Sequence, residues 1–184
     1  MRIGIIIGSV REVRQGALVG AWVADHATAH GEAEFELLDL QAFDVPIFTS
    51  AVNPALADRQ YDSPQVQRWS QAVDACDGFI FITPEYNHGV PGAFKNAVDS
   101  LGPEWTGKTV AFVSYGADNG VRAVEQWRQI IANFQMLDVR AHVGLSLFSE
   151  FGPDGLQPAD RRAGEITTLL DQLIALTARD PVTR

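Results

Sequence analysis

The chain has 184 residues, 46% of them apolar, and carries 14 Lys and Arg residues against 23 Asp and Glu residues, for a formal net charge of -9. Length and composition are those of an ordinary globular domain, so we expect residues 1–184 to form a single domain with one continuous core. The negative charge, with no local basic patch, excludes nucleic acid as a partner.

The chain opens on the apolar run MRIGIIIGSV, which predicts a buried first strand. This run is too short to span a membrane and lacks a small-residue cleavage site, so we expect neither a membrane partner nor export. The only cysteine, Cys76, has no partner for a disulfide within the chain. We therefore predict a cytoplasmic location, because free thiols are typical of that reducing compartment.

Short apolar runs rich in Ile, Val and Phe alternate along the chain with longer stretches of helical periodicity. This alternation is typical of a parallel sheet covered by helices on both faces. The strands are predicted at about Arg2 to Ile7, Glu34 to Leu38, Gly78 to Thr83, Thr109 to Tyr115, and Ala141 to Leu147.

A helix is predicted after each strand, from apolar residues that recur at spacings of three and four. The first runs from about Gly16 to His30, and its apolar face consists of Leu18, Val19, Trp22, Val23 and Ala27. The second starts after the N-cap Ser63, which is followed by a proline. Pro91-Gly92 and Gly120 open the third and fourth helices, and the last spans about Ala159 to Ala178.

Five such units match the smaller doubly wound α/β fold, a five-stranded parallel sheet of order 2-1-3-4-5. Ligands of this fold bind beyond the carboxyl ends of the strands, where the loops after the first, third and fourth strands are neighbours. The long connection from Gln41 to Asp62 has no clear period. It fits a lid, an interface arm or a plain surface excursion.

The first of these three loops, Gly8 to Gly16, joins a buried strand to a helix. A phosphate placed there would meet backbone N–H groups, the positive end of the helix dipole and the guanidinium of Arg11. The loop is neither a P-loop nor a G-x-G-x-x-G turn. It predicts a phosphate site, with an ordinary turn carrying surface arginines as the alternative.

The second loop, Thr83 to Gly92, is rich in residues that restrict the backbone, such as Pro84. Tyr86 provides a ring face, and we expect exposed N–H groups near Tyr86 and Asn87 to bond the heteroatoms of a flat ring. His88 has no Cys, Ser or second His near it in the sequence, so we interpret it as a solvated loop residue.

The third loop, Ser114 to Arg122, ends the fourth strand and starts a helix. Gly116 and Gly120 allow the backbone to approach a ligand closely or to take a positive φ. The Asn119-Gly120 pair alone would predict a simple turn. Its position at the shared edge of the sheet favours a ligand-binding loop instead.

Three strings in these loops, GSVREVRQG, FITPEYNHGVPGAFKNAVDSL and VSYGADNGVRA, resemble the signature segments of the NAD(P)H-dependent FMN reductase family, which includes quinone and chromate reductases. They occur in the family's order and spacing, and the resemblance extends from Arg2 to about Leu147. It implies a flavodoxin-like FMN-binding domain with NADPH or NADH as co-substrate and a small-molecule electron acceptor. It also implies a homodimer, with a tetramer as a further possibility, whose flavin sites lie near the interface.

The resemblance assigns twelve residues to FMN in three groups. The phosphate group consists of Ser9, Arg11, Gln15, Gly16 and Ala17. The residues that border the isoalloxazine are Pro84, Glu85, Tyr86 and Asn87, and those at its other edge are Ser114, Tyr115 and Gly116. Many relatives carry two glycines where this chain has Asn119-Gly120, but Asn tolerates a positive φ, so we expect the loop to keep its shape.

Because N5 of FMN is the reactive atom, we expect no catalytic or metal-ligating side chain. The predicted reaction is a ping-pong hydride transfer to acceptors such as quinones, flavins, azo compounds or chromate. The alternative function is a flavodoxin-type electron carrier or a flavin-binding redox sensor without nicotinamide turnover. A receiver domain is disfavoured, because it needs acidic residues where this chain has Gly8-Ser9 and Thr83-Pro84. The sequence leaves the acceptor and the preference between NADH and NADPH open.

Overall fold

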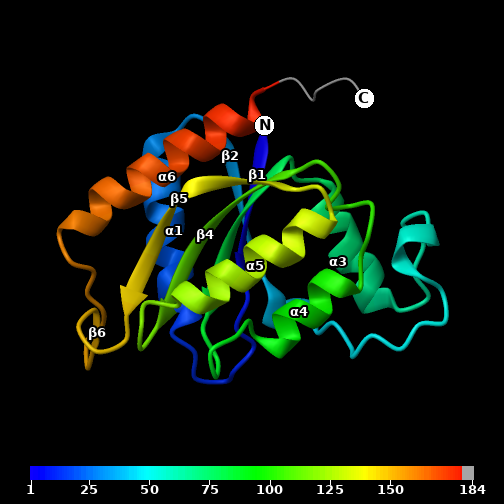
Figure 1. Cartoon of the computed structure of the whole chain (residues 1–184), viewed down its shortest axis with the longest axis horizontal. Helices are drawn as coiled ribbons and strands as arrows, with labels where there is room; N and C mark the ends of the chain where they lie inside the picture. Colours follow the sequence, from blue (N-terminus) through cyan, green and yellow to red (C-terminus); the bar gives the residue numbers. More distant parts are fainter. Residues whose placement is uncertain (180–184) are drawn as a thin grey trace.

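A computed structural model describes residues 1–179 as a parallel sheet with helices on both faces (Figure 1). The strand order β2-β1-β3-β4-β5 confirms the predicted topology, and every neighbouring pair is parallel. The strands of this sheet are β1 (Arg2–Ile7), β2 (Glu34–Asp39), β3 (Gly78–Pro84), β4 (Thr109–Gly116) and β5 (Leu137–Ser146).

Two helices cover one face of the sheet and three cover the other. The first group is α1 (Gly16–His30) and α6 (Arg161–Thr177), and the second is α3 (Pro64–Asp74), α4 (Gly92–Asp99) and α5 (Val121–Asn133). Alternate residues of the buried strands feed two separate cores: Ile5 packs on the α1 and α6 side, whereas Ile6 packs on the α3 to α5 side. The two helical layers are seen on opposite sides of the sheet in Figure 1.

The predicted apolar face of α1 is wrong at one position, since Leu18 is 42% exposed. The buried stripe instead runs through Gly16, Val19, Gly20, Val23 and Ala27. A Cβ at Gly20 would lie 2.7 Å from Cδ1 of Ile7, so glycine lets the helix approach β1 closely. That contact turns Leu18 away from the sheet and toward Gly155, whose Cβ position would lie 3.4 Å from Leu18.

Two further features were missed in the second half of the chain. Strand β5 begins at Leu137 rather than Ala141, because the pairing register shifts between Val110 and Phe112 and breaks the alternation expected of a strand. A hairpin of two short strands, β6 (Phe151–Gly152) and β7 (Gly155–Leu156), follows β5. Strands of two residues are too short to produce a periodic signal.

The long connection after β2 contains a short helix, α2 (Leu40–Phe43), and a 3-10 helix, η1 (Pro54–Leu56). Between them the side chain of Asn96 on α4 donates to the carbonyl of Pro46 (2.8 Å) and accepts from the N–H of Phe48 (2.8 Å). The connection is therefore attached to the α4 face of the molecule.

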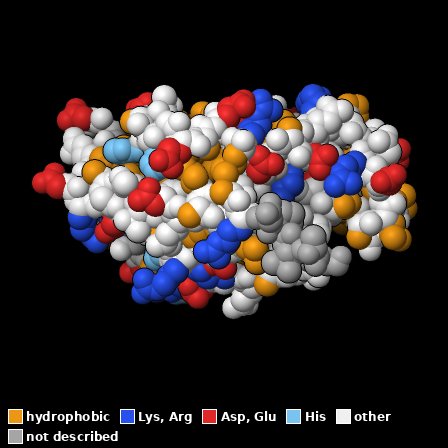
Figure 2. All heavy atoms as spheres, turned by 90° about the horizontal axis from the view of Figure 1, so that it is seen from above, with side chains coloured by type: hydrophobic (Ala, Val, Ile, Leu, Met, Phe, Trp, Pro, Cys, Tyr) orange, Lys and Arg blue, Asp and Glu red, His pale blue; other side chains and the backbone are white. Residues whose placement is uncertain are grey.

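No helix among residues 1–179 is both long and apolar enough to cross a membrane. Seen from above the view of Figure 1, Lys and Arg side chains lie among Asp and Glu side chains (Figure 2). Among the residues that the structure describes, that face shows no large basic patch of the kind that binds a phosphate backbone.

Candidate functional site

The loops after β1, β3 and β4 meet at the carboxyl edge of the sheet, the lower edge in Figure 1. Backbone hydrogen bonds join them there. The N–H of Gly8 donates to the carbonyl of Ile82 (2.9 Å), and the N–H of Glu85 donates to the carbonyl of Tyr115 (3.0 Å). The structure thus brings the three loops that were singled out in the sequence into one continuous rim.

The first loop is shaped by Arg14, which the sequence did not single out. Its guanidinium donates to the carbonyl of Ser9 (2.8 Å) and to both carboxylate oxygens of Asp39 at the end of β2. Its side chain is only 10% exposed, and the hydrogen bond to Asp39 raises the pKa of Arg14. The guanidinium of Arg14 is therefore engaged in hydrogen bonds that shape the loop. The exposed Arg11, in contrast, makes no hydrogen bond or ion pair within the described chain.

The start of α1 presents unpaired backbone donors beside Arg11. The first helical hydrogen bond runs from the N–H of Val19 to the carbonyl of Gln15 (3.1 Å), and no side chain caps the helix. The N–H groups of the three residues before Val19 therefore point out of the helix end. A Cβ at Gly16 would lie 2.9 Å from the hydroxyl of Tyr115, so this buried position requires glycine. The next residue, Ala17, is exposed.

The second loop contains a tight two-residue turn. The N–H of Tyr86 donates to the carbonyl of Gly89, the reverse bond also forms, and both measure 3.0 Å. Asn87 and His88 between them have φ values of 51° and 65°, as a type I′ turn requires. The prediction of a free N–H is therefore wrong at Tyr86, while the N–H of Asn87 has no partner among residues 1–179.

Glu85 joins the second loop to the third. Its carboxylate, 7% exposed, accepts from the backbone N–H of Arg122 (3.0 Å) and from the guanidinium of the same residue (2.8 Å). Arg122 lies in the first turn of α5, so Glu85 caps that helix from a neighbouring loop. Pro84, just before it, is buried at the end of β3. This capping role needs the folded chain and leaves no signal in the sequence.

The third loop folds around the buried hydroxyl of Ser114, which donates to the carbonyl of Asn119 (2.6 Å). Asn119 and Gly120 have φ values of 59° and 73°, which confirms the expectation that Asn is accepted there. Gly116 is buried, and a Cβ on it would lie 3.2 Å from the Cβ of Glu85. The second and third loops therefore pack directly against each other.

Hydroxyl groups from all three loops converge. The hydroxyls of Ser9 and Tyr86 are hydrogen-bonded at 2.9 Å, across the first and second loops. Burial, with the proximity of Tyr86, raises the pKa of Tyr115, although the nearby Ser9 hydroxyl and Arg14 act in the other direction. The contacts of these phenols could not be seen in the sequence, which spaces them far apart.

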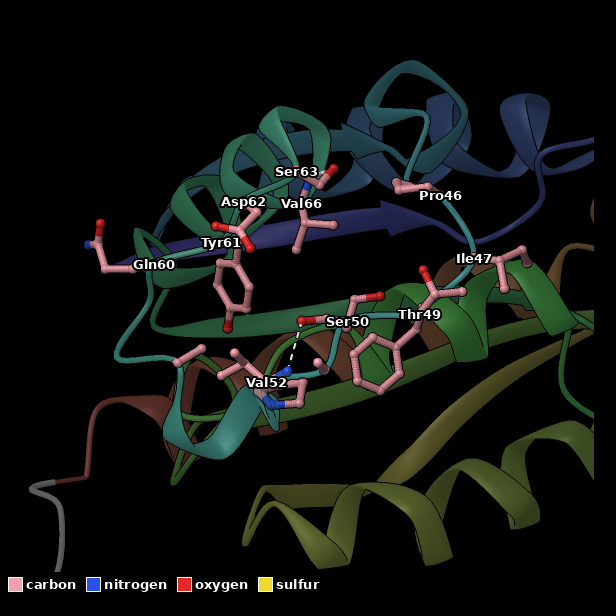
Figure 3. A pocket seen from close by; sticks show the side chains of 15 residues that line it. Pro46, Ile47, Thr49, Ser50, Val52, Gln60, Tyr61, Asp62, Ser63 and Val66 are labelled. Carbon is pink, nitrogen blue, oxygen red and sulfur yellow. Dashed lines mark hydrogen bonds between the residues drawn. The ribbon is translucent and has the colours of Figure 1, made fainter.

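A separate cavity of about 320 Å³ lies under the long connection, away from the three loops (Figure 3). Tyr61 and Val66 face Ser50 and Val52 across it. None of the twelve residues assigned to the cofactor lines this cavity. Its lining therefore adds no residue to the site at the carboxyl edge.

Comparison with known proteins gives a family match. The family model described as NADPH-dependent FMN reductase matches residues 1–150. The chain is 41% identical over 129 residues to an NAD(P)H-dependent FMN reductase of Nectria sp, covering 68% of this chain and 64% of that protein. It is 26% identical over 163 residues to a quinone reductase of Pseudomonas putida, covering 82% of each.

Among solved structures, the chain resembles a flavoenzyme NAD(P)H:(acceptor) oxidoreductase from Paracoccus denitrificans. The TM-score is 0.73, and 96% of each chain is covered at 19% sequence identity. At that identity the likeness concerns the fold alone. The aligned part of the chain spans just under two thirds of the length of the Nectria protein.

Proposed function

Because the chain belongs to the NADPH-dependent FMN reductase family, we propose that it is an oxidoreductase that holds FMN and takes hydride from NADPH or NADH. The electrons pass to a small acceptor. One observation carries the proposal: three loops are joined at one sheet edge beside Arg11, a cation without a partner in the described chain.

The donors at the start of α1 fit the phosphate of FMN. A phosphate only accepts hydrogen bonds near neutral pH, and this end of the molecule offers N–H groups, hydroxyls and a free guanidinium. The missing Cβ of Gly16 lets the hydroxyl of Tyr115 come close to this helix end. We assign the phosphate to Ser9, Arg11, Gln15, Gly16 and Ala17, as predicted from the sequence.

The ring would lie between the second and third loops, bordered by residues that the hydrogen bonds of Glu85 hold in place. We assign its surroundings to the remaining seven residues: Pro84, Glu85, Tyr86, Asn87, Ser114, Tyr115 and Gly116. Bound FMN would supply hydride chemistry at N5, so the chain itself needs no catalytic acid, base or nucleophile. The backbone N–H of Asn87, which has no partner among residues 1–179, would stabilise negative charge on the ring.

We propose quinones, flavins, azo compounds or chromate as acceptors. The name of one relative, a quinone reductase, supports the quinones. We propose that the nicotinamide leaves before the acceptor enters the same open face, which gives ping-pong kinetics. Initial rates at several fixed quinone concentrations should then give parallel lines in double-reciprocal plots. Intersecting lines would contradict this order of binding.

An electron carrier of the same fold is the competing function, and one experiment separates the two. The purified protein should release FMN on denaturation, and the holoprotein should lose its yellow colour when NADPH or NADH is added without oxygen. Adding a quinone should restore the colour. A holoprotein that neither nucleotide bleaches would instead be a carrier or a sensor.

Replacing Arg11 by alanine should weaken FMN binding by about 1.5–3 kcal/mol, the usual value of a hydrogen bond to a charged group. The loss is measured by titrating apoprotein with FMN and following flavin fluorescence. Arg161→Ala, an exposed change on α6, is the matched control and should bind like the wild type. Unchanged affinity in Arg11→Ala would remove this residue from the phosphate site.

We also propose that the chain acts as one FMN-binding domain, as a homodimer and in the cytoplasm. Exposed apolar side chains on the long connection, Ile47 (74%) and Leu56 (80%), support a partner surface. The buried free thiol of Cys76 is compatible with a reducing compartment. Sedimentation equilibrium distinguishes a monomer, a dimer and a tetramer.

A further inference from the structure

Two tyrosines from different loops bring their hydroxyls to the start of α1. The hydroxyl of Tyr86 lies 2.9 Å from that of Ser9, the first polar residue after β1. The hydroxyl of Tyr115 lies 2.9 Å from the Cβ position of Gly16, the first residue of the helix, and the same position is 3.4 Å from Ser9. Both phenols therefore end where the phosphate donors are gathered.

We propose that the hydroxyls of Tyr86 and Tyr115 donate hydrogen bonds to the phosphate of FMN. This inference rests on the proposed function and changes one part of it, because both residues were assigned to the ring from the sequence. Replacing either tyrosine by phenylalanine removes only its O–H group and keeps the aromatic ring, so such variants test the two hydroxyls alone.

The burial of Ser9 next to Tyr86 supports the assignment of the Tyr86 hydroxyl to the phosphate. Ser9 is only 1% exposed, and the hydroxyl of the half-buried Tyr86 is its neighbour. If the Ser9 hydroxyl donates to the Tyr86 oxygen, the proton of Tyr86 is left for an acceptor outside the pair. The Ser9 side chain then orients Tyr86, and Ser9 contributes to the phosphate site its backbone N–H, which has no partner among residues 1–179.

Tyr115 is held in a fixed position by its surroundings. Its side chain is 5% exposed, and its ring centroid lies 6.0 Å from that of Phe151 on the β6–β7 hairpin. Burial raises the pKa of Tyr115, so the phenol stays protonated at neutral pH. A phosphate carries no proton to donate above its second pKa of about 6, and it needs such donors.

The test compares FMN with riboflavin, which has the same ring and no phosphate. Full-length apoprotein carrying Tyr86→Phe or Tyr115→Phe is titrated with each flavin, and binding is followed by flavin fluorescence. Each variant should bind FMN about 10-fold or more weakly than the wild type and riboflavin within about 3-fold of it. Tyr61→Phe is the control. The Tyr61 hydroxyl donates to the carboxylate of Glu104 (2.8 Å), and Tyr61 lines the separate cavity under the long connection.

Each alternative outcome has a distinct meaning. Equal weakening of both flavins would place the hydroxyls at the ring, and unchanged FMN binding in both variants would remove them from the site; either result overturns the inference. Wild-type protein that binds neither flavin would overturn the proposed function itself. If Tyr115→Phe fails to fold, Tyr86→Phe on the surface turn decides, and the 31P signal of its bound FMN should shift from that of the wild type.

Discussion

Replacing Arg162 by methionine is expected to lower the free energy of unfolding by about 3–5 kcal/mol, the usual cost of leaving a buried charge unpaired. Arg162 and Glu150 have side chains only 6% and 4% exposed, and two hydrogen bonds of 2.7 and 2.9 Å join them. The measurement is urea unfolding followed by tryptophan fluorescence. Arg161→Met is the control, because Arg161 is 65% exposed and pairs only at the surface with Glu165.

The same pair predicts how stability depends on pH. Burial alone would raise the pKa of Glu150, but hydrogen bonds from Arg162 and from the N–H groups of Ser146 and Ala159 outweigh it and lower this pKa to about 2. A lowered pKa in the folded state stabilises the protein above the unfolded value of 4.5, and this contribution disappears as pH falls from there toward 2. The stability gap between wild type and Arg162→Met should therefore narrow over that range. A constant gap would contradict the role given to Glu150.

Breaking the pair should also disturb the site. The carboxylate of Glu150 accepts from the N–H of Ser146 (2.8 Å), and the next residue, Leu147, donates to the carbonyl of Gly116 (3.0 Å) in the third loop. Arg162→Met should therefore bind FMN more weakly than Arg161→Met under conditions where both are folded.

Replacing Gly8 by alanine should have the second large effect, a loss of about 3 kcal/mol of stability together with weaker FMN binding. A Cβ at Gly8 would lie 2.0 Å from Cδ1 of Phe94, a ring that is fully buried on α4. The backbone at Gly8 and the ring of Phe94 must therefore move apart. Because Gly8 starts the first loop, this movement should also disturb FMN binding. Thermal unfolding and FMN titration measure the two effects.

Gly92→Ala is the matched control for Gly8→Ala, because nothing lies within 4 Å of its Cβ position at the start of α4. It should unfold and bind FMN like the wild type. The double variant Gly8→Ala with Phe94→Leu should be more stable than the sum of the single changes predicts, since the smaller side chain leaves room for the methyl group. Strict additivity would mean that the ring is not the obstacle.

The fold could be predicted from the amino-acid sequence, and so could the meeting of the three loops at one edge of the sheet. The strands, the five long helices and the three loops follow from local features: apolar runs, helical spacing, and Gly, Pro and Asn at the chain reversals. The strand order was predicted because five such units match a known doubly wound fold. The positive φ of Asn119 was predictable for the same reason, because it depends on the residue type and its immediate neighbours. The boundary of β5 was not, since a register shift against β4 decides it.

The side chains that hold the loops together could be identified only from the folded chain. Arg14 meets Asp39 25 residues away, Glu85 meets Arg122 37 residues away, and Ser9 meets Tyr86 77 residues away. None of these contacts has a sequence signal, because they depend on which strand ends lie next to each other and on how closely the helices pack. The orientation of Leu18 was likewise not predictable from the sequence. Its spacing predicted burial, but the close approach of Gly20 on α1 to Ile7 on β1 leaves Leu18 on the outer side of the helix. Periodicity records the local conformation of the chain, whereas the direction of a side chain at a loop depends on the packing of distant segments.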